Sequence, residues 1–221
     1  MYMINLLTLP LAYLIGSIPS GLLVVKAATG KDLRQIESGR TGGTNAMRAA
    51  GPLAGLFTAV LDISKGAAAI WVGRSLFSGP DWIIALNGLL AIIGHNYSAF
   101  LLKRGEDGKL HFRGGAGGAT TLGVAIGLWV NSWFIILPIA FLVYLLIGYA
   151  SVTTISIALS TAGIFTVKAF QGLMPWIYAG LGLAAVAVVM IALRPNLKRL
   201  KEGTERRVNL LARIFHPKKF K

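Results

Sequence analysis

The sequence predicts an all-α integral membrane protein with about seven transmembrane helices. Of its 221 residues, 55% are hydrophobic, and the mean hydropathy of +0.67 is far above that of a soluble domain. Several apolar runs are long enough to cross a bilayer. The runs are continuous rather than alternating, and a spanning segment must satisfy its own backbone hydrogen bonds, so helices are favoured over a β-barrel.

The basic residues gather in three segments. The formal net charge is +14, and 19 of the 22 Lys and Arg residues lie in the loop 26–50, the loop 103–118 or the tail 194–221. Seven spans place all three segments on one side of the cell (inner) membrane, and the positive-inside rule makes that side cytoplasmic and the N-terminus external. We expect one transmembrane domain over 1–193, followed by a basic, amphipathic cytoplasmic tail over 194–221.

Composition also excludes several classes of function. No soluble domain is available to carry a nucleic-acid-binding fold, so the positive charge is assigned to topology and to attraction by membrane lipids, and no nucleic-acid partner is expected. The chain has no cysteine, which excludes disulfides, thiol catalysis and thiolate metal sites. His95, His111 and His216 show no metal-ligand spacing. We therefore expect neither a metal nor a cofactor.

The first span is expected over 3–25. Positive charge follows this apolar run instead of preceding it, which argues for a retained helix and against a cleaved signal peptide. Pro19 is expected to kink the helix near its inner end, because proline removes a backbone hydrogen bond.

The second span, about 51–73, carries two charges near its middle, Asp62 and Lys65. Each charge costs roughly 2.5–3.5 kcal/mol on the membrane-insertion scale. At the spacing i,i+3 the two side chains share a helix face and can pair. Two interpretations stay open: a structural ion pair that faces the bundle, or a pair that faces a substrate.

The third span, about 82–102, contains His95, which fits either a hydrogen-bonded structural role or a functional one. The loop 103–118 follows and ends in a glycine-rich run that leads into the next helix, with Thr120 in its first turn. Glycines before a helix N-terminus can cradle an anion, although the same pattern is typical of a flexible linker or of tight helix packing.

From 119 to 193 the chain is almost uncharged, with Lys168 as the exception, and this length holds about four spans. Breaks are expected near 130–132, 149–151 and 171–175. The fourth span is expected to be short.

The polar segment between the first two spans is the strongest candidate site. It reads Ser38-Gly39-Arg40-Thr41-Gly42-Gly43-Thr44-Asn45-Ala46-Met47-Arg48. Glycine lets backbone N–H groups converge on an anion, and arginine supplies fixed forks of donors. Together with the second glycine-rich loop and the region of Asn196, this segment predicts a cationic pocket for phosphates at the cytoplasmic face.

Several motifs, in matching order, resemble those of the bacterial PlsY family of membrane acyl-phosphate:glycerol-3-phosphate acyltransferases. The resemblance covers nearly the whole chain. The segments that carry it are Gly16-Ser17-Ile18-Pro19 with Gly21; Ser38-Gly39-x-x-Gly42-x-Thr44-Asn45-x-x-Arg48; Asp62-x-x-Lys65-Gly66; Gly94-His95; Phe112-x-Gly114-Gly115-x-Gly117-x-Ala119-Thr120; and Asn196-Leu197-x-Arg199-Leu200-x-x-Gly203-Thr204-Glu205.

This resemblance implies a reaction and a set of site residues. The 1-hydroxyl of glycerol 3-phosphate would attack the carbonyl of an acyl phosphate, giving phosphate and lysophosphatidic acid without a covalent acyl-enzyme, a metal or coenzyme A. The implied catalytic residues are Ser38, Arg48, Asn196 and His95. The implied substrate-binding residues are Gly39, Arg40, Gly42, Gly43, Thr44, Asn45, Asp62, Lys65, Arg113, Gly114, Gly115, Gly117, Thr120 and Arg194.

Several positions depart from the family pattern, and one departure is in the first loop, which reads Glu37-Ser38-Gly39-Arg40 where the family usually has Gly-Ser-Gly-Asn. Ala116 stands where the family has a lysine and Leu193 where it has a histidine, and both belong to the family's active site. Arg40 or Arg113 could replace the lost positive charge. The second loop also looks lengthened, by residues 105–111. Two alternatives to an active acyltransferase stay open: a catalytically weakened relative that binds a related anionic lipid or acceptor, and a small transporter for anionic solutes.

Overall fold

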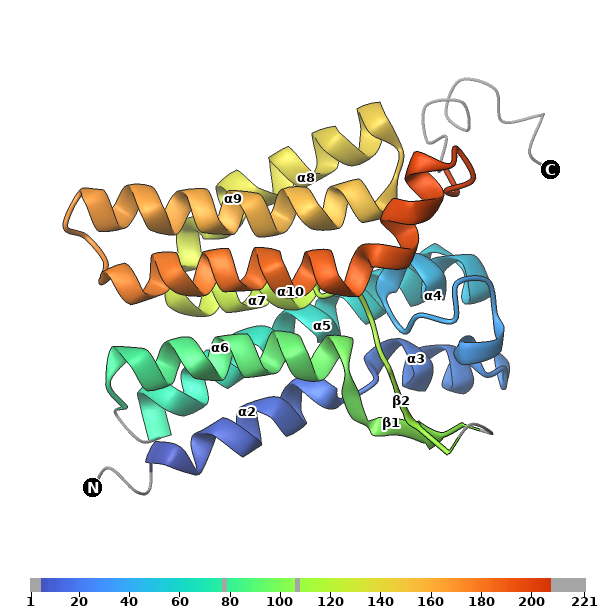
Figure 1. The fold of residues 1–221 in the computed structure, drawn as a ribbon, viewed down its shortest axis with the longest axis horizontal. Coiled ribbons are helices and arrows are strands. Elements are labelled where there is room, and N and C mark those ends of the chain that lie inside the picture. Colours follow the sequence, from blue (N-terminus) through green and yellow to red (C-terminus); the bar gives the residue numbers. More distant parts are fainter. Residues whose placement is uncertain (1–4, 77–78, 106–107, 208–221) are drawn as a thin grey trace.

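The helices lie side by side in a bundle, and a β-hairpin leaves it at one end (Figure 1). The computed structural model describes residues 5–76, 79–105 and 108–207. The helices are α2 (Thr8–Ser17), α3 (Ser20–Thr29), α4 (Gly43–Ala50), α5 (Pro52–Trp71), α6 (Asp81–Asn96), α7 (Gly118–Leu128), α8 (Trp133–Ile147), α9 (Ala150–Phe170) and α10 (Trp176–Lys201). Short helical turns occupy Leu33–Gln35, Val72–Leu76 and Val130–Ser132. The strands β1 (Ser98–Arg104) and β2 (Leu110–Arg113) pair antiparallel.

Among the described residues, five helical stretches are long and apolar enough to cross a membrane on their own. They are Thr8–Thr29, Pro52–Ser75, Val130–Ile147, Ala150–Phe170 and Trp176–Lys201. The prediction of a helical, multi-pass membrane protein is thereby confirmed. Two further helices of the bundle are shorter: α6 has 16 residues and α7 has 11. The length of α7 agrees with the short fourth span predicted from the sequence.

The first span is interrupted where the sequence predicts a kink. Ile18 and Pro19 separate α2 from α3, because the proline has no N–H to donate to the helix. α3 then continues to Thr29 and ends at Gly30, whose φ of 70° suits glycine at a helix terminus. The span therefore runs beyond the predicted end at residue 25.

The apolar second half of the chain breaks where predicted. Residues 130–132 separate α7 from α8, residues 148–149 separate α8 from α9, and residues 171–175 separate α9 from α10. α10 continues past residue 193 to Lys201, so the expected division between membrane domain and tail falls inside this helix. The amphipathic part of the expected tail, from residue 208 onward, lies outside the described residues.

The third span ends earlier than predicted, and the fold is not purely helical. The sequence predicts a helix as far as residue 102, whereas α6 ends at Asn96 and Ser98 begins β1. The apolar run 98–102 is too short for its periodicity to separate strand from helix. Tertiary contacts decide the outcome, since β2 supplies a pairing partner and the Ser98 hydroxyl donates to the Ser17 carbonyl at 2.5 Å.

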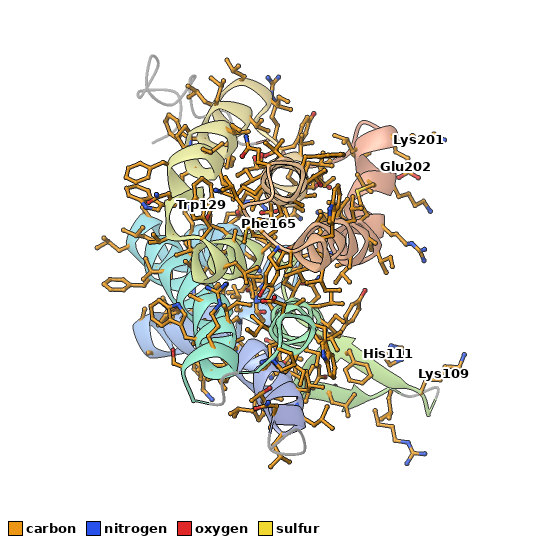
Figure 2. All side chains as sticks on the ribbon, turned by 90° about the vertical axis from the view of Figure 1, so that its left-hand side faces the viewer. Lys109, His111, Trp129, Phe165, Lys201 and Glu202 are labelled. Carbon is orange, nitrogen blue, oxygen red and sulfur yellow. The ribbon has the colours of Figure 1, made fainter. Side chains whose placement is uncertain are left out.

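Glycines allow the helices to approach closely. A Cβ added to Gly94 of α6 would overlap the carbonyl oxygen of Tyr13 in α2, and one added to Gly66 of α5 would overlap that of Thr120 in α7. Large apolar side chains fill the remaining interior, and Phe165 of α9 lies fully buried at the centre of the bundle (Figure 2). The helices that carry the loops are thus held at fixed spacing.

We expect Gly94→Ala to lower the free energy of unfolding by about 1–3 kcal/mol, the usual cost of overpacking. The matched control is Gly163→Ala in α9, where an added Cβ meets nothing within 4 Å. Alanine at that position is expected to be neutral or to stabilise the helix by about 0.5–1 kcal/mol. Unfolding of both variants in detergent micelles measures the difference, and equal stability would contradict the close contact between α2 and α6.

Candidate anion-binding site

The two basic loops meet at the end of the bundle where α4, the hairpin and the end of α10 lie together (Figure 1). The amide of Thr41 donates to the carbonyl of Gly114 at 3.2 Å. The guanidinium of Arg40 donates to the carbonyl of Gly115 at 3.0 Å. The polar loop after α3 is therefore in direct contact with the glycine-rich run before α7.

The first of two cavities at this end has a volume of about 410 Å³. It lies among α4, α5, the start of α7, α8, α9 and α10. Its polar lining includes Ser38, Arg40, Thr44, Asn45, Arg48, Asp62, His95, Ser151, Thr154, Asn196, Glu205 and Arg206. Its apolar lining includes Met47, Ile63, Leu122, Leu137, Tyr144, Ile157 and Leu193. The same cavity thus has a polar, basic part formed by the loops and an apolar part formed by the spanning helices.

The second cavity has a volume of about 700 Å³ and is rich in arginine. The arginines that line it are Arg34, Arg40, Arg113, Arg194 and Arg199. Arg34 is neutralised by Asp32, and its hydrogen bonds lower the pKa of that carboxyl to about 2. Arg199 is likewise paired, with Glu205 at 2.9 Å. For the other three arginines, the described part of the chain contains no ion-pair partner.

Three residues, Ser38, Arg40 and Asn196, line both cavities and mark their junction. Arg40 is held there by backbone oxygens: its two terminal nitrogens donate to Gly115 at 3.0 Å and to Ala192 at 2.5 Å. Burial and the neighbouring charge of Arg199 lower the pKa of the Arg40 guanidinium from its usual value. Glu205 acts in the opposite direction, and a bound anion would add to its effect by attraction to the guanidinium.

Two helix N-termini face the first cavity. Gly43 and Thr44 at the start of α4 line it, as do Gly117 and Gly118 at the start of α7. The first N–H groups of a helix lack intrahelical acceptors and carry partial positive charge, so both termini favour an anion. Gly117 has a φ of 90°, which a side chain would strain.

A buried trio of Asp62, Lys65 and His95 supports this cavity from within the bundle. The Lys65 ammonium lies 2.9 Å from Asp62 Oδ1 and donates to the carbonyl of Ile18 at 2.8 Å. His95 Nδ1 lies 3.5 Å from the same Asp62 oxygen. The ion pair expected from the i,i+3 spacing therefore forms. Asp62 and His95 also line the cavity. The pair can therefore be a structural ion pair inside the bundle and still face a substrate.

Glu205, which follows α10, organises the neighbouring polar side chains. Its carboxylate accepts hydrogen bonds from Asn196 Nδ2 at 2.8 Å, Arg199 Nε at 2.9 Å and Ser151 Oγ at 3.4 Å. The next residue, Arg206, pairs with Glu37 of the first loop. These contacts fix Asn196 at the junction and join the end of α10 to both α9 and the first loop.

Most of the predicted site residues line a cavity. The first cavity receives Gly42, Gly43, Thr44, Asn45, Arg48, Asp62, His95 and Gly117, and the second receives Gly39, Arg113, Gly114, Gly115 and Arg194. Lys65 and Thr120 line neither of these two cavities. Lys65 is directed to its partner Asp62, and Thr120 is fully buried where α7 packs on α5.

Asn45 has a role inside the loop as well. Its side-chain amide donates to the carbonyls of Ile36 and Arg40 at 3.1 and 2.8 Å. These bonds hold the loop in its turn beneath α4. The side-chain donor of Asn45 is therefore used by backbone carbonyls, whereas Thr44, Arg48 and the first amides of α4 lie at the cavity.

Sequence reasoning missed Asn96, at the end of α6. It is 4% exposed, lines the second cavity, and neither of its amide atoms has a hydrogen-bond partner in the described part of the chain. A buried polar group without a partner is costly, so a ligand that satisfies it would bind more tightly. In the sequence, only its position directly after His95 suggests that Asn96 belongs to the site. Its amide lines the cavity because α6 ends at this residue, earlier than the sequence predicts.

Two of the departures from the family pattern lie together. Ala116 and Leu193 belong to one apolar cluster. Arg40 donates to the carbonyls of the residues directly before each of them. Of the two arginines expected to replace the lost charge, Arg40 therefore lies beside both departures, and Arg113 lines only the second cavity.

Comparison with known proteins gives a consistent result. The family profile described as "Glycerol-3-phosphate acyltransferase" matches residues 6–203. A glycerol-3-phosphate acyltransferase of Thermus thermophilus is 39% identical over 209 residues, covering 91% of this chain and 94% of the relative. Glycerol-3-phosphate acyltransferase 2 of Moorella thermoacetica is 38% identical over 205 residues, covering 92% and 97%.

Two solved structures of PlsY (YgiH), an integral membrane glycerol 3-phosphate acyltransferase, share the fold. The glycerol 3-phosphate form superposes with a TM-score of 0.80 at 29% identity, covering 96% of this chain and 99% of that one. The lysophosphatidic acid form superposes with a TM-score of 0.78 at 27% identity and the same coverage.

The buried ion pair provides a test of what holds the site in place. Asp62→Asn is expected to destabilise the fold by about 3–5 kcal/mol, because it leaves the Lys65 charge buried without compensation. The double variant Asp62→Asn/Lys65→Met removes both charges and is expected to recover most of that loss. Unfolding in detergent micelles compares the two. If the double variant were no more stable than the single one, the pair would not be the stabilising contact.

Proposed function

The chain belongs to the glycerol-3-phosphate acyltransferase family, and we propose that it transfers the acyl group of an acyl phosphate to glycerol 3-phosphate at the junction of the two cavities. Its product is lysophosphatidic acid, and it acts as a multi-pass membrane protein in phospholipid biosynthesis. The choice of acyl phosphate as donor follows from the motif resemblance.

The observation that carries the proposal is the position of Arg40. It lines both cavities, and its guanidinium is hydrogen-bonded to backbone carbonyls, with Glu205 as a more distant negative charge. Two phosphates brought to contact distance repel each other, so their site needs cations and N–H donors between them. An arginine at the junction can contact both anions with separate N–H groups.

The acyl phosphate suits the first cavity. Its phosphate would lie against the N-termini of α4 and α7, with Arg48 as the side-chain cation. Its acyl chain would follow the apolar lining, which includes Ile63, Leu137 and Ile157 from three different spanning helices. This placement puts the carbonyl carbon near the junction, at the border between the cationic end and the apolar wall.

Glycerol 3-phosphate suits the second cavity, which contains more arginine and less apolar surface. Its phosphate would lie near Arg113 and Arg194, whereas Asn96 offers an amide to its hydroxyls. The 1-hydroxyl would then point towards Ser38 and Asn196 at the junction. The free arginines select a dianion, and the cavity size of about 700 Å³ leaves room for a small polar acceptor.

The reaction then proceeds by direct displacement. The oxygen of the 1-hydroxyl forms a bond to the acyl carbonyl carbon, and the bond from that carbon to the phosphate oxygen breaks. Negative charge develops on the carbonyl oxygen and then on the departing phosphate, where Arg40 and the helix N-termini would stabilise it. The hydroxyl proton leaves to an oxygen of the phosphate or to His95, so inorganic phosphate and lysophosphatidic acid are formed.

The proposed topology has seven crossings, with α2 and α3 forming the first and α5 to α10 the others. An odd number of crossings agrees with the two basic loops and Asn196 lying at one end, while α2 begins at the other (Figure 1). The positive-inside rule then makes the site cytoplasmic and the N-terminus external. Both substrates would reach the site from that side, the acyl phosphate through the lipid-facing wall.

Membership of the family favours an acyltransferase over the transporter considered from the sequence. The weakened-relative alternative rests on Ala116 and Leu193, and the position of Arg40 between those residues argues against it. The direct experiment is incubation of purified protein with acyl phosphate and labelled glycerol 3-phosphate. Formation of labelled lysophosphatidic acid supports the proposal. Absence of labelled lipid, beside an active relative in the same assay, would refute it.

Arg40→Ala is expected to lower kcat/KM by about 10²–10³-fold, because it removes charge-assisted hydrogen bonds made most strongly in the transition state. Arg40→Lys is expected to recover only part of the rate, since an ammonium cannot bridge two carbonyls and an anion with one planar fork. The matched control is Lys198→Gln, which removes the same charge from an exposed side chain at the same end of the bundle. An equal effect of Lys198→Gln would show that only long-range charge matters.

The double substitution Ala116→Lys/Leu193→His restores the lysine and the histidine that the family has at these positions. It tests whether Arg40 replaces them in this chain. In the native background we expect no more than a few-fold change in kcat. In the Arg40→Ala background we expect at least about a tenfold recovery, because a cation returns to the junction. A large gain in the native background would instead support the weakened-relative alternative.

A further inference from the structure

The β-hairpin of β1 and β2 leaves the bundle sideways, at the end that carries the basic loops (Figure 1). Figure 2 looks along the helices, and there Lys109 and His111 lie at the outer end of the hairpin, well away from the bundle. The helices cross the membrane, so this end of the bundle, and the hairpin with it, lies at a membrane surface. The hairpin thus projects beyond the side of the helix bundle.

Its orientation is fixed at the base. The Ser98 hydroxyl donates to the carbonyl of Ser17 at 2.5 Å, and the amide of Ala99 lies 3.4 Å from the Ser17 hydroxyl. Leu101 is 4% exposed and anchors the strand on the bundle. At the outer end, the amide of Gly105 donates to the carbonyl of Lys109 at 2.8 Å and closes the turn. Contacts with the bundle at its base therefore determine the orientation of the hairpin.

Its outer face carries an unusual amount of exposed apolar surface. The exposed fractions are 58% for Phe100, 42% for Leu102 and 60% for Leu110, whereas the exposed Phe112 lines the second cavity. β1 has a register irregularity between Ser98 and Lys103, and within it Leu101 is buried whereas Phe100 and Leu102 are exposed. A two-stranded hairpin is only marginally stable in water by itself, and exposed apolar patches normally have a partner.

The pairing register separates the two faces. Leu110 lies opposite Arg104, and His111 lies opposite Lys103. Leu102 and Leu110 thus share one face with Arg104, and Lys103 lies on the other face with His111. Arg113, at the base of β2, lines the second cavity. The acidic residues 106 and 107 at the turn lie outside the described residues.

We propose that this hairpin lies in the interface of the anionic leaflet, with Leu102 and Leu110 entering the boundary between headgroups and acyl chains. Apolar side chains flanked by Lys and Arg are the composition that binds such a surface, because burial and attraction to anionic lipid act together. Membrane beside the spanning helices is also the nearest partner along the direction in which the hairpin extends. This role is separate from acyl transfer and requires only that the bundle be in a membrane.

The chain contains no cysteine, so single labelling sites can be introduced cleanly. The test sites are Leu102→Cys and Leu110→Cys, and the control on the opposite face is Lys103→Cys. Each protein carries an NBD fluorophore and is reconstituted into vesicles of phosphatidylcholine with phosphatidylglycerol. Nitroxide-labelled lipid is expected to quench the labels at 102 and 110 at least about twofold more than the label at 103, and aqueous iodide is expected to do the reverse.

Three outcomes would overturn the proposal. Equal iodide quenching at all three sites would place the hairpin in water. Protection of the label at 110 in detergent micelles, together with cross-linking to a second copy, would assign the face to a protein contact. Lipid quenching unchanged in vesicles of phosphatidylcholine alone would remove the requirement for an anionic leaflet.

Elution of each labelled protein with the unlabelled protein in size-exclusion chromatography is the folding control. Acyl transfer is measured separately, and none of the three residues lines either of the two cavities. An active protein whose hairpin is exposed to water would refute this inference and leave the proposed function intact. A protein that fails to transfer acyl groups but shows the expected lipid quenching would do the opposite.

Discussion

The guanidinium of Arg40 joins three segments that lie far apart in the sequence: the first loop, the glycine-rich run before α7, and α10. It does so through hydrogen bonds to the carbonyls of Gly115 and Ala192, and it forms no ion pair within the described part of the chain, although the charge of Glu205 is near enough to act on it. A buried charge that is satisfied only by neutral oxygens is costly, and a bound anion would lower that cost.

Such an arrangement needs rigid support, because loops alone would relax around the unpaired charges. Support comes from helices that pack at glycine contacts, where Gly94 meets α2 and Gly66 meets α7. It also comes from the Asp62–Lys65 ion pair, which lies beside His95 directly under the first cavity. The membrane strengthens both effects, since a charge inside it has few alternatives to its partner.

The departures at Ala116 and Leu193 become intelligible in this setting. The two side chains pack together in an apolar cluster, and Arg40 lies against the backbone beside them. Arg40 thus places a cation from the first loop beside the two positions where the family has a lysine and a histidine.

Local sequence features were sufficient to predict the class of this protein, most of its spans and its family. The long apolar runs, the break at Pro19 and the glycine and arginine motifs determined its class, most of its spans and its family, because hydrophobicity, proline geometry and motif spacing are properties of neighbouring residues. The tertiary structure alone decided that residues 98–102 form a strand, that Asn96 opens onto a cavity and that Lys65 and Thr120 line neither of the two cavities. Each of those outcomes depends on which distant segment supplies a partner, and periodicity along the chain carries no information about that choice.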